Sequence, residues 1–207
     1  MRYLPFVSIL LLVTSCGSAY KQLQRTNAPT DCVKAFRPTF TRGLYHAQIN
    51  VTGKHLSGLL LIKNMPDGST RMVFTNEAGL SFFDFEWTGT AFNVRRIIRQ
   101  MDRKALIKTL RKDFELILMQ HLDAKDPYTL QGEEVYYRVF PNGKDHYYYL
   151  TDAACSTLIR MERGSRKKKV MEAVMMPSNR DIPDSIGIKH YNFNFEIGLK
   201  RLYDIER

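Results

Sequence analysis

Apolar and polar residues alternate with a period of two along most of the chain. This alternation is typical of β-strands that bury one face and expose the other. Over 80–87, Phe83, Phe85 and Trp87 fall on one face, and the acidic residues between them fall on the other. The alternation is cleanest over 189–200, where aromatic and aliphatic residues alternate with polar residues and glycine. Both stretches are therefore predicted to be strands.

Residues that favour tight turns separate the alternating stretches. Pro66-Asp67-Gly68, Pro141-Asn142-Gly143 and Gly164-Ser165 provide the fixed or positive φ angles that hairpins require. Short connections between neighbouring strands require antiparallel pairing, so the pattern predicts a meander of about ten strands with one apolar face. The other predicted strands lie at 43–51, 55–64, 70–76, 92–98, 134–140, 146–151, 156–162 and 168–176.

One helical pattern interrupts the strands. From residue 103 to about residue 122, apolar residues recur at spacings of three and four, and they include Leu106, Leu110 and Phe114. Asp102 is the expected N-cap, and the cations of the segment lie mainly away from the apolar stripe. The economical way to bury the stripe is against the apolar face of the sheet. The predicted fold class is mainly β (α+β), with one long amphipathic helix covering a concave sheet.

The N-terminus has the features of an export signal. One cation, Arg2, precedes an apolar run at 4–13 that is too short to span a bilayer. Val13-Thr14-Ser15-Cys16 resembles the bacterial lipobox, which implies cleavage before Cys16 and acyl chains on its sulfur. The alternative is an ordinary secretory signal with an incidental cysteine. We expect a signal peptide at 1–15, a lipidated tether at 16–32, and one domain at 33–207.

No aspartate follows Cys16 directly, whereas an aspartate there retains enterobacterial lipoproteins in the inner membrane. By this resemblance the domain is expected on the periplasmic face of the outer membrane. Cys32 and Cys155 are the two remaining cysteines. In an oxidising compartment they could form a disulfide, and the alternative is two separate buried thiols.

The formal net charge is +10, which could suggest a nucleic-acid partner. An exported, anchored chain does not normally meet nucleic acid, so none is expected. The densest cationic cluster surrounds the predicted hairpin tip at Gly164-Ser165 and includes Arg166, Lys167 and Lys168. These side chains could contact anionic lipid head groups, or they could form a solvated turn that resists aggregation.

The sequence shows no recognisable catalytic pattern. It has no GxSxG nucleophile elbow, no GxxxxGK[ST] loop and no GxGxxG fingerprint, and its five histidines show no HxxxH spacing. We therefore expect neither an enzyme nor a metal or cofactor site.

The signal, the lipobox, the antiparallel meander and the crossing helix together resemble the LolA/LolB-like family of periplasmic lipoprotein carriers and outer-membrane acceptors. Several stretches of sequence contribute to this resemblance. They are Gly53-Lys54-His55-Leu56-Ser57-Gly58, Asp67-Gly68-Ser69, Arg71-Met72-Val73-Phe74, Phe83-Asp84-Phe85-Glu86-Trp87 and Pro183-Asp184-Ser185-Ile186-Gly187-Ile188. The resemblance implies an incomplete β-barrel whose open apolar side is covered by helices. An anchored chain leans towards the acceptor type, in which an exposed apolar loop residue serves membrane transfer, and Met65 is the nearest counterpart.

The corresponding functional hypothesis is a monomeric envelope lipoprotein whose half-barrel encloses an apolar cavity for acyl chains of a lipid or lipoprotein. Each candidate lining residue could equally be plain core. The alternative is a structural or adaptor lipoprotein of an envelope complex with a filled core. The candidate lining residues are Phe74, Phe83, Phe85, Trp87, Leu106, Leu110, Phe114, Met175, Phe193 and Phe195.

Overall fold

The computed structural model describes residues 19–89, 91–178 and 182–203. These residues form thirteen strands, one α-helix and one short 3₁₀ helix at Asp31–Phe36. The helix α1 spans Lys104–Ile117. The strands are β1 (Gln24–Thr26), β2 (Gly43–Val51), β3 (Lys54–Asn64), β4 (Thr70–Thr75), β5 (Ser81–Thr88), β6 (Ala91–Ile97), β7 (Tyr128–Gln131), β8 (Tyr136–Asn142), β9 (Asp145–Thr151), β10 (Leu158–Gly164), β11 (Lys169–Met176), β12 (Ser185–His190) and β13 (Phe195–Arg201).

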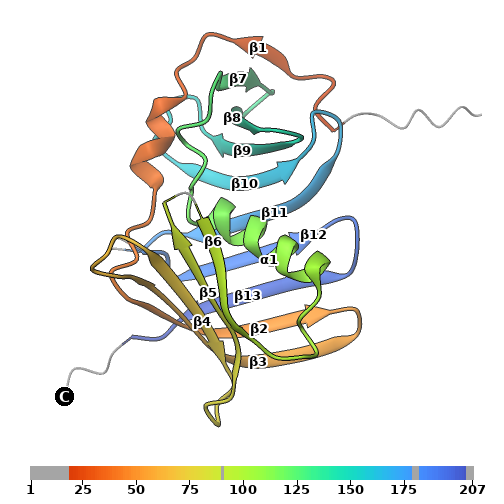
Figure 1. The fold of residues 1–207 in the computed structure, drawn as a ribbon. Coiled ribbons are helices and arrows are strands. Elements are labelled where there is room, and N and C mark those ends of the chain that lie inside the picture. The colour runs from red at the N-terminus through yellow and green to blue at the C-terminus, as the bar shows by residue number, and fades with distance from the viewer. Residues whose placement is uncertain (1–18, 90, 179–181, 204–207) are drawn as a thin grey trace, which may run out of the picture.

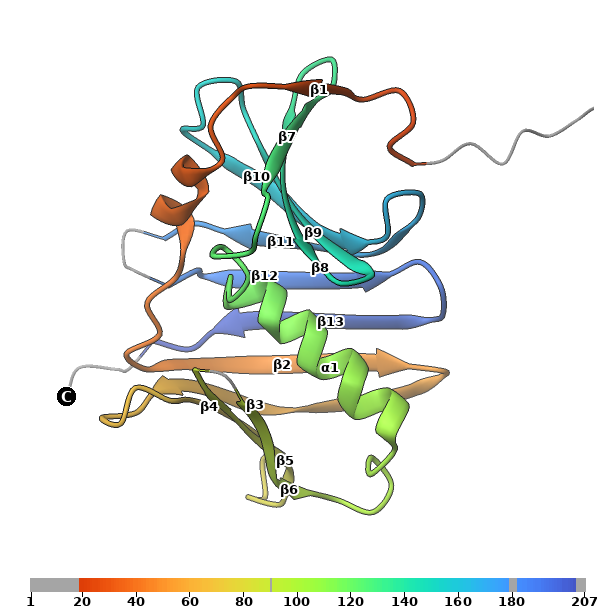
Figure 2. The same ribbon diagram turned by 45° about the horizontal axis from the view of Figure 1, so that its top comes forward.

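All thirteen strands belong to one antiparallel sheet in the order β1-β7-β8-β9-β10-β11-β12-β13-β2-β3-β4-β5-β6. The sheet curls but does not close, so β1 and β6 remain at its two edges (Figures 1 and 2). The pairing of β13 with β2 joins two meanders, one on each side of α1 in the chain. The predicted antiparallel, incomplete barrel is confirmed, and the fold is the one that the LolA/LolB-like resemblance implies.

The helix α1 crosses the concave face of the sheet, as expected (Figure 2). Leu110, Phe114 and Ile117 are buried against core residues from both meanders. No helix in the described part of the chain combines the length and apolarity needed to cross a bilayer.

The structure corrects several predicted boundaries. The stretch at 189–200 is not one strand, because β12 ends at His190 and β13 begins at Phe195. Burial changes phase there, since His190 and Phe195 both face inward although their numbers differ in parity. Because the apolar alternation continues through the intervening turn, the sequence pattern gives no sign that the strand is interrupted. The strands β1, β7 and β12 were not predicted.

The predicted helix was also too long. Its N-cap is Arg103 and not Asp102, and no side chain caps the first turn. The helix ends at Ile117, and Met119 adopts a positive φ of 51°. The apolar pattern continues beyond that point because Leu118, Met119 and Leu122 are buried in irregular structure.

The described part of the predicted tether belongs to the folded domain, which corrects the expected boundary at residue 33. Tyr20 is only 7% exposed, and its ring stacks on Tyr148 with centroids 4.3 Å apart. Strand β1 pairs with β7. Tyr20 and Leu23 join a second, smaller apolar cluster on β8 and β9 with Val139, Tyr148 and Leu150. Because the rest of this segment is polar, its few buried apolar residues were not recognised from the sequence.

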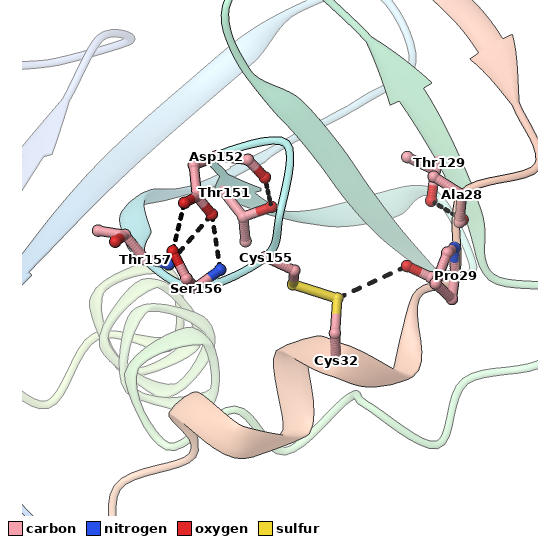
Figure 3. The surroundings of a disulfide bond; sticks show 9 residues. All are labelled: Ala28, Pro29, Cys32, Thr129, Thr151, Asp152, Cys155, Ser156 and Thr157. Carbon is pink, nitrogen blue, oxygen red and sulfur yellow. Dashed lines mark hydrogen bonds between the residues drawn. A yellow bond between two sulfur atoms is a disulfide. The ribbon is translucent and has the colours of Figure 1, made fainter.

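A disulfide links Cys32 to Cys155, which confirms the predicted pair and excludes two separate thiols (Figure 3). It fastens the 3₁₀ helix to the turn between β9 and β10, across 123 positions of sequence. The Asp152 carboxylate stabilises this turn by accepting hydrogen bonds from the Ser156 and Thr157 amides at 2.7 and 3.1 Å (Figure 3). The N-terminal segment is thereby held at both β1 and the disulfide.

The curl of the sheet brings the end of β4 across the inner face of β3. A Cβ atom on Gly58 would lie 2.0 Å from the Thr75 carbonyl oxygen, a backbone atom that cannot easily move. Gly58 is therefore required by this close approach. Gly187 on the outer face offers a contrast, because a Cβ atom there would meet nothing within 4 Å.

We expect Gly58→Ala to lower the free energy of unfolding by about 1–3 kcal/mol, because β3 and β4 must separate to admit the methyl group. Gly187→Ala is the matched control and should be neutral or slightly stabilising, since alanine restricts the unfolded chain more than glycine. Urea denaturation of the oxidised protein measures both. Equal stabilities of the two variants would contradict the proposed close approach.

Candidate functional site

The residues predicted to line a cavity mostly form a packed core. Phe74, Phe83 and Phe85 are 0% exposed, and a void that could hold a water molecule beside these rings would leave some of their surface accessible. The Phe83 ring stacks on that of Phe85 with centroids 4.4 Å apart and lies 6.4 Å from that of Phe114. Trp87, Leu110 and Phe195 are likewise buried in this core. The expected cavity is therefore filled at these positions.

The other three predicted lining residues, Leu106, Met175 and Phe193, are only half-buried. Met175 borders a cleft of about 600 Å³ between the segment 35–39 and the ends of β10 and β11. Leu106 and Phe193 lie elsewhere, in the first turns of α1 and in the turn between β12 and β13. The structure thus does not bring the three into one site.

Leu106 and Phe193 belong to a set of half-buried apolar residues at one end of the barrel, which we call the open end. Strands β2 and β6 end there, and β3 and β5 begin there, at the same end as the start of α1. In Figure 2 the β2–β3 turn and the start of α1 lie at the right, and the ends of β5 and β6 lie at the bottom. The apolar interior is only partly covered at this end. The residues of the set are Val51, Leu56, Phe82, Ile97, Ile98, Leu106 and Phe193.

The helix is held unevenly along its length. Six of the eight residues from Leu110 to Ile117 are buried, whereas none of the six residues from Lys104 to Thr109 is. The first turn has no side-chain cap and no acidic residue. Lys104 instead places a positive charge at the positive end of the helix dipole, which is unfavourable. The first turns of α1 are consequently its least stabilised part.

A cleft of about 420 Å³ runs beside these first turns, between α1, β6 and the hairpin of β8 and β9. Phe92, Ile107 and Tyr147 provide apolar surface in it. Its cationic residues are Lys104, Lys108, Arg111 and Lys112. A second cleft of about 480 Å³ shares Arg111 and Glu115 and continues past the C-terminal end of α1. Glu115 and Asp145 also line the first cleft, where they pair with Arg111 and Lys112.

A buried ionic group fixes the second half of α1 to the sheet. Asp113 is 0% exposed, and its Oδ1 accepts a hydrogen bond from Arg163 Nη2 of β10 at 3.0 Å. Its Oδ2 lies 2.8 Å from His190 Nε2 of β12. Lys112 pairs with Asp145 of β9 at the edge of this group. We call Asp113, Arg163 and His190 the helix clamp.

Glu115 forms a second polar contact on the buried half of α1. Its carboxylate accepts a hydrogen bond from Arg111 Nε at 2.6 Å and lies 3.1 Å from His121 Nε2. Burial acts to raise the pKa of Glu115, but the hydrogen bonds to His121 and Arg111 outweigh it, so the pKa lies below its ordinary value of 4.5. Glu115 therefore remains ionised inside the protein.

The clamp and Glu115 were missed at the level of sequence. The available signal was that Asp113 lies three residues after Leu110 and four before Ile117, which places a charge on the apolar stripe. A charge at such a position must find a partner in the structure. The partners Arg163 and His190 lie on distant strands, so sequence spacing could not reveal them.

Two groups of predicted membrane contacts lie at opposite ends of the strands. Arg166, Lys167 and Lys168 are exposed in the turn between β10 and β11, at the open end. Met65 is half-buried in the turn between β3 and β4, at the other end (Figures 1 and 2). The structure therefore does not bring the two groups together into one patch. Cys16 lies outside the described residues.

No protein-family model matches the chain, and no curated protein matches it. Solved structures that are similar to it at low identity include the following two. One is a domain named for outer membrane lipoprotein sorting, from Vibrio parahaemolyticus, with a TM-score of 0.48, 5% identity, and coverage of 86% of this chain and 93% of that chain. The other is a DUF1329 family protein from Desulfovibrio piger, with a TM-score of 0.45, 9% identity, and coverage of 86% and 92%. The described residues contain no cluster of side chains suited to a metal ion.

The helix clamp generates a prediction about stability. We expect Asp113→Leu to lower the free energy of unfolding by about 3–5 kcal/mol, because it leaves the buried Arg163 charge with only the more distant Asp145 carboxylate at 3.8 Å. Arg163→Met should cost a similar amount, and the double variant should cost less than the sum of the two. Glu196→Gln, at the exposed ion pair with Lys189, is the control and should cost at most about 1 kcal/mol. Strict additivity in urea denaturation would contradict the clamp.

Glu115 should make stability depend on pH. Because its pKa is lower in the folded protein, its stabilising contribution is complete above the ordinary value of 4.5. The contribution is lost as the pH falls through the folded pKa. The stability difference between the wild type and Glu115→Gln should therefore shrink at acidic pH, with the exposed Glu77→Gln as the control. A difference that stays constant from pH 7 to about pH 3 would contradict this assignment.

Proposed function

We propose that this chain is an exported lipoprotein, acylated at Cys16, whose half-barrel takes up an acyl chain of a lipid or lipoprotein at its open end. Its proposed location is the periplasmic face of the outer membrane, where it would act in envelope lipid or lipoprotein transport or localisation as a binding protein and not as an enzyme. The observation that carries the proposal is the partly covered apolar interior beneath the weakly held first turns of α1.

Export is supported by two independent features. The N-terminal pattern through Cys16 matches a lipobox, and more than one acyl chain on the cysteine gives stable anchoring. The disulfide between Cys32 and Cys155 is typical of proteins in oxidising compartments such as the periplasm.

Because the interior is filled near Phe83 and Phe85, an acyl chain would enter where the core is least closed. The first turns of α1 would lift while the helix clamp holds the second half in place. Lifting these turns breaks few packing contacts, because no residue from Lys104 to Thr109 is buried. Each CH₂ group that the chain then buries contributes about 0.8 kcal/mol.

The cationic side of the cleft would accommodate the head group. Lys104 and Lys108 line the cleft beside Ile107. A phosphate or carboxylate could lie near these ammonium groups while its chain enters below Leu106. The other charged groups of the cleft are paired with each other, Arg111 with Glu115 and Lys112 with Asp145, so the proposed selectivity is for an anionic amphiphile and not for one particular head group.

A second candidate function is a structural or adaptor role with no lipid ligand. The complete burial of Phe74, Phe83 and Phe85 favours it, because a packed core needs no ligand. It would act through a stable protein partner, whereas a lipid-binding protein retains an amphiphile.

Lipid extraction followed by mass spectrometry, together with titration of a fluorescent fatty acid, tests the proposal. We expect acyl ligand in protein purified from membranes, and about tenfold weaker binding by Leu106→Asp, because a charge would then face the apolar opening. Met176→Asp is the matched control, since Met176 is 57% exposed at the last residue of β11, away from the open end, and it should bind normally. No retained lipid and no fatty-acid binding would leave the adaptor function instead.

A further inference from the structure

The chain enters the folded domain directly beside the basic turn of β10 and β11. The Ala19 amide donates a hydrogen bond to the Lys167 carbonyl at 3.0 Å. The Tyr20 hydroxyl donates to Glu162 Oε2 of β10 at 2.9 Å, and the Tyr20 ring stacks on Tyr148. The Tyr148 hydroxyl in turn donates to the Ser165 carbonyl at 2.9 Å. Residues 19 and 20, which we call the strap, are thus held firmly against this hairpin.

The strap leaves little chain between the domain and the proposed anchor. Cys16 precedes Ala19 by three positions, and three fully extended residues reach at most about 11 Å. This distance is about one Debye length at physiological ionic strength, so charges at the start of the domain would interact with the membrane surface. The covalent chain therefore fixes which end of the domain lies nearest the lipid.

The same end of the domain is rich in positive charge. Lys167 and Lys168 are exposed and form no ion pair with any residue in the described ranges. Lys144 is exposed in the neighbouring turn between β8 and β9, and Lys104 is exposed at the start of α1. The turns at the opposite ends of the strands carry the acidic residues Asp67, Glu133, Glu134, Asp152 and Asp184, whereas Glu77 and Asp102 lie in the connections at the open end.

We propose that the open end, with the strap and the turn Ser165–Lys168, docks on an anionic phospholipid bilayer and gives the anchored domain one fixed orientation. This inference rests on the proposed acylation of Cys16 and adds the partner surface to the proposed function. Each cation close to an anionic surface strengthens binding about fivefold. The half-buried residues Leu106 and Phe193 then face the membrane, so an acyl chain can pass between the bilayer and the half-barrel without crossing water.

The test uses the full chain, expressed in a bacterium and purified from its membranes as the mature protein. Intact mass establishes whether Cys16 carries acyl chains. The protein is reconstituted into phosphatidylcholine vesicles with or without phosphatidylglycerol. A fluorophore is attached at Lys144→Cys near the open end or at Lys63→Cys near the opposite end, and head-group-labelled lipid quenches it. In anionic vesicles we expect several-fold stronger quenching at position 144 than at position 63.

Three further variants identify the groups responsible for the orientation. Combined reversal by Arg166→Glu, Lys167→Glu and Lys168→Glu should abolish most of the quenching at position 144. The matched reversal Lys34→Glu, Lys63→Glu and Lys125→Glu, which changes the same charge at positions away from the open end, should preserve it. Tyr20→Ala should reduce the quenching without affecting acylation, because it frees the strap and lengthens the connection to the membrane.

The outcomes separate the docking surface from the anchor. An acylated protein with equal quenching at positions 144 and 63 in anionic vesicles overturns the docking surface alone. A mature protein that carries no acyl chain overturns both the docking surface and the proposed anchor. Persistent strong quenching after reversal of all three hairpin cations also overturns the proposal, because the charges would then not determine the orientation.

Discussion

The structure depends on covering the concave face of a sheet that curls but never closes. A closed barrel would bury its own inner face, whereas this sheet needs α1 to exclude water from its aromatic interior. The helix clamp of Asp113, Arg163 and His190 holds only the second half of that helix. One end of the barrel is consequently sealed by apolar packing and buried charge, and the other end is closed only by exposed helical turns.

The remaining features are arranged around this difference between the two ends. The N-terminal segment, β1 and the disulfide fasten the outer side of β7, β8 and β9. The strap brings the chain into the domain at the basic turn, on the same side as the open end. The proposed anchor, the cationic turn and the opening into the apolar interior thereby share one side of the molecule, which is the arrangement required of a protein that exchanges lipid with a membrane.

Much of the architecture could be predicted from local patterns, because half-buried strands and tight turns leave a clear signature. The range predicted for β2 matches the observed strand, and counting cysteines offered the Cys32–Cys155 disulfide as one of two alternatives. Features that depend on distant residues could not be predicted in this way. The packing of Tyr20 on Tyr148, the phase change between His190 and Phe195, and the partners of Asp113 all arise from tertiary contacts. The sequence also could not show whether the interior is filled, because a core residue and a cavity-lining residue have the same apolar character.

Hydrogen exchange along α1 in the presence of lipid tests most directly whether the first half of the helix acts as a movable cover. The amides of Ile107, Lys108 and Thr109 are hydrogen-bonded within α1, as are those from Phe114 to Ile117. If the clamp holds only the second half, the first group should exchange much faster than the second. An anionic phospholipid should then alter the exchange of the first group alone. Uniform protection along the helix, unchanged by lipid, would show that α1 is one rigid part of the core and would contradict the proposed opening.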